Sequence, residues 1–288
     1  MPHNPSVSAD DEVLKFFSAY IEREIGIVYA DHNAFQLRNR LDEICKLVGE
    51  PDIHALHRSA KGGIAGAFKQ LLVDVATNNE TSFFRDPKVF RAIEETILPE
   101  LLELYPNNES IQIWSAASST GQEAVSLAIL LEEAKLKLKR GFDFHIVGSD
   151  ISERALAKAR DGVYSQLEVQ RGLPAALMIK YFSKDERDRW VFRPALRQKT
   201  EFKKQNLKDP FSKIGQFGMV LCRNVLIYQN VESKKEILGR ITKQLIPGGF
   251  LLLGSGESLI GLSQDYQQVG VEGAVIYRKK KDATSVAA

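Results

Sequence analysis

Residues 111–139, IQIWSAASSTGQEAVSLAILLEEAKLKLK, contain a short apolar run, a loop of small residues and a long helical pattern. The same succession returns further along the chain. FHIVGSD (144–150) precedes the helical pattern SERALAKARDG, and FGMVLCRNVLIY (217–228) precedes VESKKEILGRITKQL, which IPGGFLLLGSGE follows. Strands that alternate with helices at this spacing predict parallel βαβ units. The fold class is therefore α/β, a Rossmann-like, doubly wound sheet.

The last patterned segment, DYQQVGVEGAVIYRKK (265–280), contains two short strand patterns around Glu272 and Gly273. It predicts an antiparallel hairpin at the end of the sheet. A parallel sheet that ends in such a hairpin is the layout of S-adenosylmethionine-dependent methyltransferases. The charged stretch from about 181 to 205 is broken by Pro194, and we interpret it as a small β-subdomain inserted between a helix and a strand.

The N-terminal part shows helical patterns only. Apolar residues recur at intervals of three and four in EVLKFFSAYIEREIG (12–26) and in AFQLRNRLDEICKLVGE (34–50), and a third helix is expected from about Gly66 to Val75. We therefore divide the chain into an all-helical domain over 1–76, a connecting segment over 77–92, and a sheet domain over 93–288.

Composition limits the classes of protein. The 288 residues are 44% hydrophobic and 26% charged, with a net charge of +2, too small to indicate nucleic-acid binding. No apolar run reaches the roughly 18 residues that span a bilayer, and the start MPHNPSVSADDE lacks a secretory pattern. Cys45 and Cys222 are the only cysteines, which indicates a reducing compartment. We expect a cytoplasmic protein without membrane insertion; the basic runs KLKLKR and YRKKK are interpreted as solvated.

Ligands of open α/β sheets bind beyond the carboxyl ends of the strands. The loop after the first strand, Ser115–Glu123, has one glycine, Gly121, and lacks the GxGxxG spacing of a dinucleotide cradle. Two roles for Glu123 remain open: contact with a ligand, or a capping box with Thr120. Asp150 ends the second strand, where a carboxylate can accept two hydrogen bonds from a ribose diol; its other role is a turn acceptor.

The next two strand ends add polar groups. Asn206 and Leu207 lie where an adenine would be read at its edge and packed on its face. Asn224 and Val225 follow the fourth strand. Arg223 adjoins that strand, where unpaired polar groups are expensive, so either a ligand or a loop hydrogen bond is needed to satisfy it.

The segment ATNNETSFFRDPKVF (76–90) places polar side chains directly beside two phenylalanines. Phe83 and Phe84 are expected to anchor it on apolar surface, at about 1.5–3 kcal/mol for each buried ring. Arg85 can make a bidentate pair with a carboxylate. The alternative is a capped helix start anchored by two core aromatics, which leaves the neighbouring polar groups unexplained.

Five stretches together closely resemble the chemotaxis receptor methyltransferases, the CheR family: NETSFFRD, SAASSTGQEAVSLA, GSDIS, CRNVLIY and PGGFLLLGSGE. The resemblance implies a segment over 77–92 that folds over S-adenosylmethionine as a lid. It also implies that the cofactor, released as S-adenosylhomocysteine and used without a metal, is contacted by Asn79, Thr81, Arg85, Glu123, Asp150, Asn206, Leu207, Asn224 and Val225.

The implied substrate is a glutamate side chain on the cytoplasmic helices of a chemoreceptor. Because a glutamate with a pKa near 4.3 is already ionised at pH 7, no general base is required, and alignment and desolvation supply the catalysis. Tyr228 and Arg85 are the candidate catalytic residues. Tyr228 has core packing at a strand end as its other role.

The chain also departs from the family pattern. Its second helix mixes Arg38, Arg40 and Lys46 with acidic residues, where relatives that dock acidic receptor helices are richer in arginine. SKDERDRW (183–190) is shorter than the glycine-containing loop of relatives that grip a receptor's C-terminal peptide. We therefore expect activity that does not depend on a receptor pentapeptide. Two alternatives stay open: a methyltransferase of another substrate, and a non-catalytic adaptor that binds S-adenosylmethionine.

Overall fold

The computed structural model describes residues 9–29, 33–105, 109–139, 141–271 and 273–281. The chain forms two compact units, each treated by itself. The helical unit consists of the described residues up to Asn78 together with Tyr228–Ser233. The sheet unit consists of Asn79–Ile227 and the described residues from Lys234 onward. The division falls within the expected connecting segment, of which residues 79–92 belong to the sheet unit.

The helical unit has four helices in its described residues. They are α1 (Ala9–Ile25), α2 (Ala34–Val48), α3 (Ile53–Lys61) and α4 (Gly66–Ala76). The apolar stripes that predicted α1 and α2 form its core, with Phe17 and Leu41 fully buried. Helix α3 was not predicted. Its local signal is Asp52, whose side chain caps the helix by accepting a hydrogen bond from the Ala55 amide at 2.8 Å.

Residues 228–233 belong to the helical unit. In sequence they lie between two parts of the sheet unit, which end at Ile227 and resume at Lys234. The Val28 amide donates to the Tyr228 carbonyl at 2.9 Å, and Ile27 and Gln229 form an antiparallel bridge. The backbone of Gly26 passes so close to Gln229 that a Cβ atom there would lie 1.9 Å from its amide oxygen. This turn therefore requires glycine.

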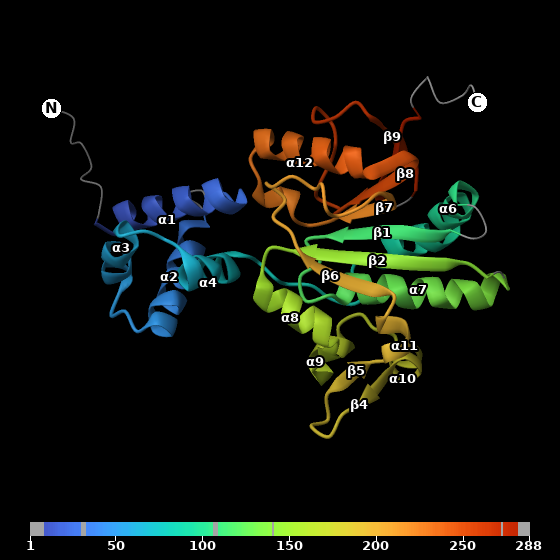
Figure 1. Cartoon of the computed structure of the whole chain (residues 1–288), viewed down its shortest axis with the longest axis horizontal. Coiled ribbons are helices and arrows are strands. Elements are labelled where there is room, and N and C mark those ends of the chain that lie inside the picture. Colours follow the sequence, from blue (N-terminus) through green and yellow to red (C-terminus); the bar gives the residue numbers. More distant parts are fainter. Residues whose placement is uncertain (1–8, 30–32, 106–108, 140, 272, 282–288) are drawn as a thin grey trace. The chain divides into compact units, whose positions relative to one another are not determined.

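Seven strands form the main sheet of the sheet unit, in the order β6-β2-β1-β7-β8-β10-β9 (Figure 1). Five neighbouring strands from β6 to β8 are parallel, and β10 runs antiparallel to both β8 and β9. The strands are β1 (Ser110–Ala116), β2 (Asp143–Asp150), β6 (Thr200–Lys204), β7 (Phe217–Cys222), β8 (Leu245–Leu253), β9 (Tyr266–Val269) and β10 (Val275–Lys279). The predicted parallel sheet and its terminal hairpin are confirmed. Gly273 has a positive φ, and Glu272, named with it for the turn, lies outside the described residues.

Helices cover both faces of this sheet, and further helices lie beside the smaller sheet described below (Figure 1). The helical segments after α4 are, in chain order, α5 (Pro87–Ala92), the π-helix η2 (Ile93–Ile97), α6 (Leu98–Leu104), α7 (Gln122–Leu138), α8 (Glu153–Asp161), α9 (Gln166–Gln170), α10 (Ala175–Tyr181), α11 (Pro194–Arg197), the 3₁₀-helix η3 (Leu226–Tyr228) and α12 (Val231–Gln244). Successive residues of β7 alternate between two cores: Met219 and Leu221 face the core with α6 and α7, and Val220 and Cys222 face the core with α12. A strand buried on both faces reads as one continuous apolar run.

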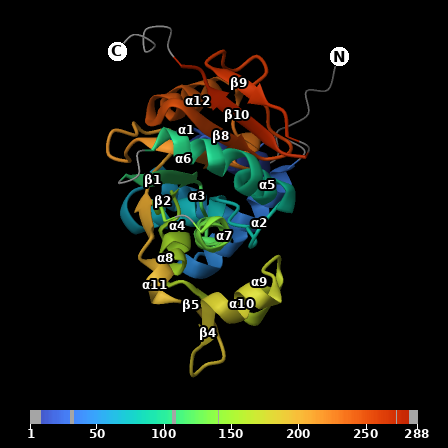
Figure 2. The same ribbon diagram turned by 90° about the vertical axis from the view of Figure 1, so that its right-hand side faces the viewer.

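A second, three-stranded sheet has the antiparallel order β3-β5-β4 and is seen with α10 at the lower end of Figure 2. Its strands are β3 (Val163–Tyr164), β4 (Phe182–Lys184) and β5 (Trp190–Phe192). These limits differ from the expected insertion over 181–205, since the small sheet starts earlier and residues 200–204 are β6 of the main sheet. Residues 200–204 belong to the main sheet because their backbone pairs with β2. The Phe202 ring also packs closely on β2, since a Cβ on Gly148 would lie 2.5 Å from it.

The segment that begins at Asn79 is anchored by aromatic packing, as its two phenylalanines predicted. Phe83 is fully buried and makes edge contacts with Tyr164 and Phe182, at centroid distances of 5.0 and 5.8 Å. Gly172 lies against it, because a Cβ there would be 2.0 Å from the Phe83 carbonyl oxygen. Phe84 packs on Phe90 at 5.0 Å. The segment thus shares the core of the sheet unit.

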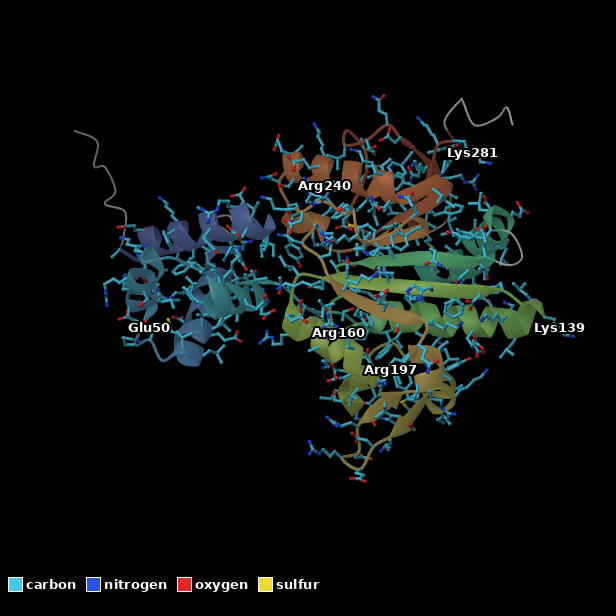
Figure 3. All side chains as sticks on the ribbon, in the orientation of Figure 1. Glu50, Lys139, Arg160, Arg197, Arg240 and Lys281 are labelled. Carbon is cyan, nitrogen blue, oxygen red and sulfur yellow. The ribbon has the colours of Figure 1, made fainter. Side chains whose placement is uncertain are left out.

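The two basic runs lie on the surface of separate elements. Lys137 is exposed in the last turn of α7 and pairs with Glu94 at 2.8 Å, while Arg140 lies outside the described residues. Figure 3 shows Lys139 at the end of α7 and Lys281 beyond the end of β10. The runs are solvated only in part. Lys135 lies over the rings of Phe142 and Phe144, 5.5 and 4.6 Å from their centroids, and Lys279 donates to the Thr242 and Leu245 carbonyls at 2.8 and 2.7 Å.

Candidate cofactor site

The carboxyl ends of β1, β2 and β7 lie side by side, because the three strands are parallel neighbours in the order β2-β1-β7. The chain continues from β1 to one side and later returns on the other side, so the strand order switches between β1 and β7. Ligands of open α/β sheets bind at such a switch point. Four of the ten predicted site residues lie at or soon after these ends: Glu123, Asp150, Asn224 and Val225.

The loop after β1 connects two other segments of the site. The Ser119 amide donates to Asp150 Oδ2 at 2.9 Å, and the Ser119 hydroxyl donates to the Asn79 carbonyl at 2.7 Å. Gly121, not Thr120, is the N-cap residue directly before α7. The described start of this helix has no hydrogen bond from a capping side chain. The capping-box role of Thr120 and Glu123 is therefore wrong.

Asp150 is 6% exposed at the end of β2, and both of its oxygens accept backbone hydrogen bonds. Its Oδ1 accepts from the Ser152 amide at 2.9 Å. The Ser152 hydroxyl in turn caps α8 by accepting from the Ala155 amide at 3.1 Å, and it accepts from Asn79 Nδ2 at 3.5 Å. The fold thus joins the candidates Asn79 and Asp150 through two serines.

Glu123 lies in a buried ionic cluster. Its Oε1 accepts from the Ser115 hydroxyl at 2.7 Å, and its Oε2 pairs with Arg223 Nη1 at 2.8 Å. Arg223, whose side chain is 2% exposed, also pairs with Asp86 Oδ2 at 2.5 Å and donates to the Arg85 carbonyl at 3.0 Å. Loop hydrogen bonds and ion pairs therefore satisfy most of Arg223, and they hold the backbone of Arg85 against the end of β7.

Arg85 and Thr81 are more exposed than the buried Phe83 that lies between them in sequence. The Arg85 guanidinium is exposed and donates to the Glu80 carbonyl at 3.3 Å, and Thr81 is half-buried. Both residues belong to the same segment as Asn79, which Ser119 holds at the end of β1.

Asn206 and Leu207 follow β6 as predicted but face different surroundings. Asn206 Oδ1 accepts from the Lys208 amide at 3.0 Å, which makes a local turn. The Leu207 side chain is buried in the core beneath α12, and its carbonyl accepts from Arg240 at 3.1 Å. In this structure Leu207 therefore packs on protein side chains.

Asn224 and Val225 are held by a residue that the sequence analysis did not single out, Glu257. The Glu257 side chain accepts five backbone hydrogen bonds at 2.7–3.2 Å. The donors are the amides of Asn224, Val225, Leu226, Ile227 and Gly254. The available signal was an acidic residue in GSGE after a fully apolar strand, because a buried carboxylate needs donors.

Tyr228 belongs to the helical unit. Its hydroxyl accepts a hydrogen bond from Asn78 Nδ2 at 3.0 Å, and the side chain is half-buried. The structure therefore pairs this candidate with the residue directly before Asn79 in sequence.

Backbone strain gathers in the site loops. Seven non-glycine residues in the described ranges have positive φ, and five of them lie here: Phe84, Asp86, Ala117, Ser119 and Asn224. This conformation costs of order 1–3 kcal/mol for a non-glycine residue and persists where the surroundings impose it. The hydrogen bonds of Ser119, Asp86 and Asn224 supply that constraint.

The site fits a polar nucleoside cofactor. Ser118 Oγ and Arg223 Nε are buried without a hydrogen-bond partner in the described structure, and both lie at the switch point. A Cβ on Gly121, which has a positive φ, would lie 2.9 Å from Ala159, so the loop after β1 needs glycine where it packs on α8. A parallel sheet that ends in an antiparallel hairpin and carries an acidic residue at the end of β2 is typical of S-adenosylmethionine-dependent methyltransferases.

Comparison with known proteins narrows the class. The family described as CheR methyltransferase, SAM binding domain, matches residues 79–275. Chemotaxis protein methyltransferase 1 of Pseudomonas aeruginosa is 36% identical over 95% of this chain and 100% of its own length. Chemotaxis protein methyltransferases of Pseudomonas putida and Vibrio parahaemolyticus are each 34% identical, over 92% and 96% of this chain and 96% and 99% of theirs. The chain belongs to the CheR methyltransferase family.

The described residues hold no group of three or more histidine, cysteine or acidic side chains that could bind a metal ion. Each described helix is too short or too polar to cross a membrane.

Proposed function

We propose that this methyltransferase forms methyl esters on glutamate side chains of chemoreceptor cytoplasmic helices, and that it acts in the cytoplasm. The single observation that carries the proposal is family membership of a chain whose strand ends hold groups of hydrogen-bonded polar side chains. The relatives named as chemotaxis protein methyltransferases support the receptor as the class of substrate.

The nine candidate residues would hold the cofactor at the carboxyl ends of the strands. Asp150 and Glu123 would accept hydrogen bonds from its hydroxyl and amino groups, and Asn206 would read the adenine. Arg85 would pair with its carboxylate. Thr81, Asn79, Asn224 and Val225 would enclose it, and Leu207 would pack on the base after a local rearrangement, because its side chain is buried in the core here.

When bound, S-adenosylmethionine would supply an electrophilic sulfonium methyl group. Attack by the acceptor carboxylate would form the C–O bond and break the C–S bond, with its electron pair left on sulfur and no proton moved. Because a glutamate is already ionised at pH 7, the reaction does not need a general base from the protein. The residues of the site would orient the reacting groups and exclude water. We assign orientation of the attacking oxygen and the methyl group to Tyr228 and Arg85.

The test uses Asp150→Asn, with Asp143→Asn as its matched control on the same strand. Asp143 begins β2 at the opposite end, is exposed and pairs with Lys199 at 2.6 Å. In Asp150→Asn an amide NH₂ replaces one acceptor oxygen and faces the Ser119 or Ser152 amide. We expect the Kd for S-adenosylmethionine in calorimetry to rise at least about tenfold, or 1.4 kcal/mol, in Asp150→Asn only.

The second readout is methyl transfer to a receptor cytoplasmic fragment. Wild type and Asp143→Asn should produce a base-labile methyl ester on glutamate, and Asp150→Asn should lose most of it. Base-stable methylation, or cofactor binding with no ester on the receptor, would contradict the proposed substrate. Equal cofactor affinity in all three proteins would contradict the assigned role of Asp150.

A further inference from the structure

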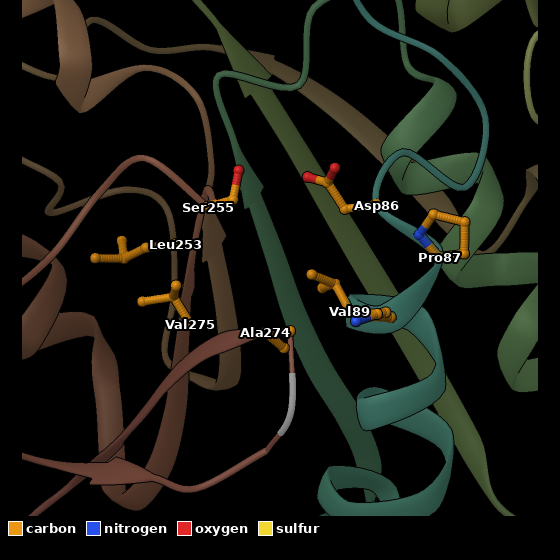
Figure 4. Close-up of a pocket in the computed structure, with 9 residues that line it drawn as sticks. Asp86, Pro87, Val89, Leu253, Ser255, Ala274 and Val275 are labelled. Carbon is orange, nitrogen blue, oxygen red and sulfur yellow. The ribbon is translucent and has the colours of Figure 1, made fainter.

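We propose that a pocket beside the cofactor site receives the acceptor glutamate side chain; this inference rests on the proposed function. The pocket, called here the acceptor pocket, has a volume of about 270 Å³ and lies between the start of α5, the end of β8 and the start of β10 (Figure 4). It is lined by Asp86, Pro87, Lys88, Val89, Leu253, Ser255, Gly273, Ala274 and Val275.

The acceptor pocket borders the candidate cofactor residues without including any of them. On one side Asp86 directly follows Arg85, and Arg223 binds both. On the other side Gly254 lies between two lining residues, and a Cβ there would be 2.7 Å from Asn224 Nδ2. A group in the pocket would therefore lie next to the cofactor rather than in its place.

The size of the pocket favours a side chain. Pockets that hold whole small molecules occupy roughly 300–1,000 Å³, and the acceptor pocket falls just below this range. One extended side chain with its carboxylate would fit in this volume.

The walls divide into an apolar and a polar part. Figure 4 shows the Asp86 carboxylate and the Ser255 hydroxyl facing the same end of the pocket, with Val89 and Ala274 facing each other further along. Methylene groups of a glutamate would lie on the apolar part, and its carboxylate would reach the Ser255 hydroxyl, which can donate. An apolar wall also limits water around the attacking oxygen, which supports the desolvation that this reaction needs.

Charge in the described lining of the pocket is balanced, since Lys88 is cationic and Asp86 is anionic. Asp86 also pairs with Arg223 at 2.5 Å. Because Arg223 compensates the Asp86 carboxylate, a second carboxylate can lie near it.

The test fills the acceptor pocket with Ser255→Leu and, separately, Ala274→Leu. Ser212→Leu is the matched control, since Ser212 is exposed and precedes the opposite, amino end of β7. Each protein is assayed for S-adenosylmethionine binding by calorimetry and for kcat/KM with a receptor cytoplasmic fragment. We expect both pocket variants to keep the wild-type cofactor Kd and to lose at least about tenfold in kcat/KM, since misplacement by 1 Å costs up to about 10².

The outcomes separate this proposal from the function on which it rests. Unchanged kcat/KM in both pocket variants, or a cofactor Kd that rises in both, would overturn the acceptor pocket while leaving the methyltransferase function intact. Wild-type protein that binds the cofactor but forms no receptor ester would instead contradict the proposed function, and with it the stated occupant of the pocket.

Discussion

Glu257 is 7% exposed and accepts hydrogen bonds from more backbone amides than any other side chain described above. Its Oε1 accepts from three successive amides, Val225 to Ile227, and its Oε2 accepts from Asn224 and Gly254. The carboxylate therefore sets the backbone path of Asn224, whose φ of 58° is strained for a residue with a side chain. Glu257 acts through the candidate cofactor residues and is a positioning residue.

At this scale we predict that Glu257→Gln weakens cofactor binding. Glutamine has one acceptor oxygen, and its NH₂ group would face amides that now donate, at a cost of about 1–3 kcal/mol for each unsatisfied group. Calorimetry should show a Kd for S-adenosylmethionine raised at least about tenfold. The same affinity in wild type and variant would refute the positioning role.

Glu168→Gln is the matched control for that substitution. Glu168 is also a carboxylate that accepts from a backbone amide, that of Ser165 at 2.9 Å, in the capping box of α9. It lies outside the contacts of the candidate residues described above. We expect it to lower the unfolding midpoint and leave the cofactor Kd unchanged, which separates loss of stability from loss of the site.

At the scale of elements, the sheet unit binds its N-terminal segment by two kinds of contact. Phe83 anchors the segment in the core through Tyr164 and Phe182, and Arg223 holds Arg85 and Asp86 at the end of β7. Removing one partner of a buried ion pair costs about 3–5 kcal/mol. The segment that carries three cofactor candidates is therefore part of the sheet unit and not a loose linker.

The packing of α3 on α1 gives a prediction about pH. His57 is buried against Phe16, at a ring-centroid distance of 4.6 Å, and burial, aided by Lys61, lowers its pKa below the ordinary 6.5. The folded state then binds fewer protons than the unfolded state. The stability from neutral His57 is therefore fully present above about pH 6.5 and is lost as the pH falls from there through the lowered pKa of the folded state.

The measurement compares wild type with His57→Phe, which keeps an aromatic ring and removes the titration. Thermal unfolding midpoints at pH 7.0 and 5.5 should fall more on acidification in wild type than in the variant. Equal falls in the two proteins would show that protonation of His57 does not limit the packing of α3.

Short elements were the ones that sequence patterns missed. Helix α3 spans 9 residues and β3 only 2, so neither shows enough periods to stand out. The strand end expected before Asn206 is that of β6, but the expected insertion was extended over TEFKK, because this stretch is charged and only Phe202 marks its buried face. Its position in the main sheet comes from pairing with β2, which no local pattern encodes.

At the scale of the whole molecule, the chain passes three times between the two units: at Asn78, at Tyr228 and at Ser233. Candidate residues lie on both sides of these crossings, with Tyr228 in the helical unit and the others in the sheet unit. Partner recognition belongs to this scale, because the proposed substrate is a protein domain rather than a small molecule.

We predict that recognition does not require a receptor's C-terminal pentapeptide. The turn between β4 and β5 is closed on itself: Asp185 accepts from the amides of Arg187 and Arg189 at 3.0 and 2.8 Å, and pairs with the Arg189 guanidinium at 2.7 Å. The backbone amides of Asp185, Arg187, Asp188 and Arg189 thus already donate within the turn. Receptor fragments with and without their last five residues should be methylated at equal rates, and calorimetric binding of the pentapeptide tighter than about 1 mM would contradict this.

Sequence alone determined the α/β class, the terminal hairpin, the helical N-terminal part and the family, because each rests on local periodicity or on contiguous motifs such as NETSFFRD and CRNVLIY. It also located the strand ends where site residues gather. The cofactor roles of those residues stay predictions.

Only the tertiary structure decided which of these groups bind one another. Arg223 meets Glu123 and Asp86, 100 and 137 positions away, and Glu257 meets amides about 30 positions away. The same packing buries Leu207 beneath α12 and places β6 beside β2. Hydrogen bonds and ion pairs between distant residues depend on how strands are ordered and registered, and that order has no signature in any single stretch of sequence.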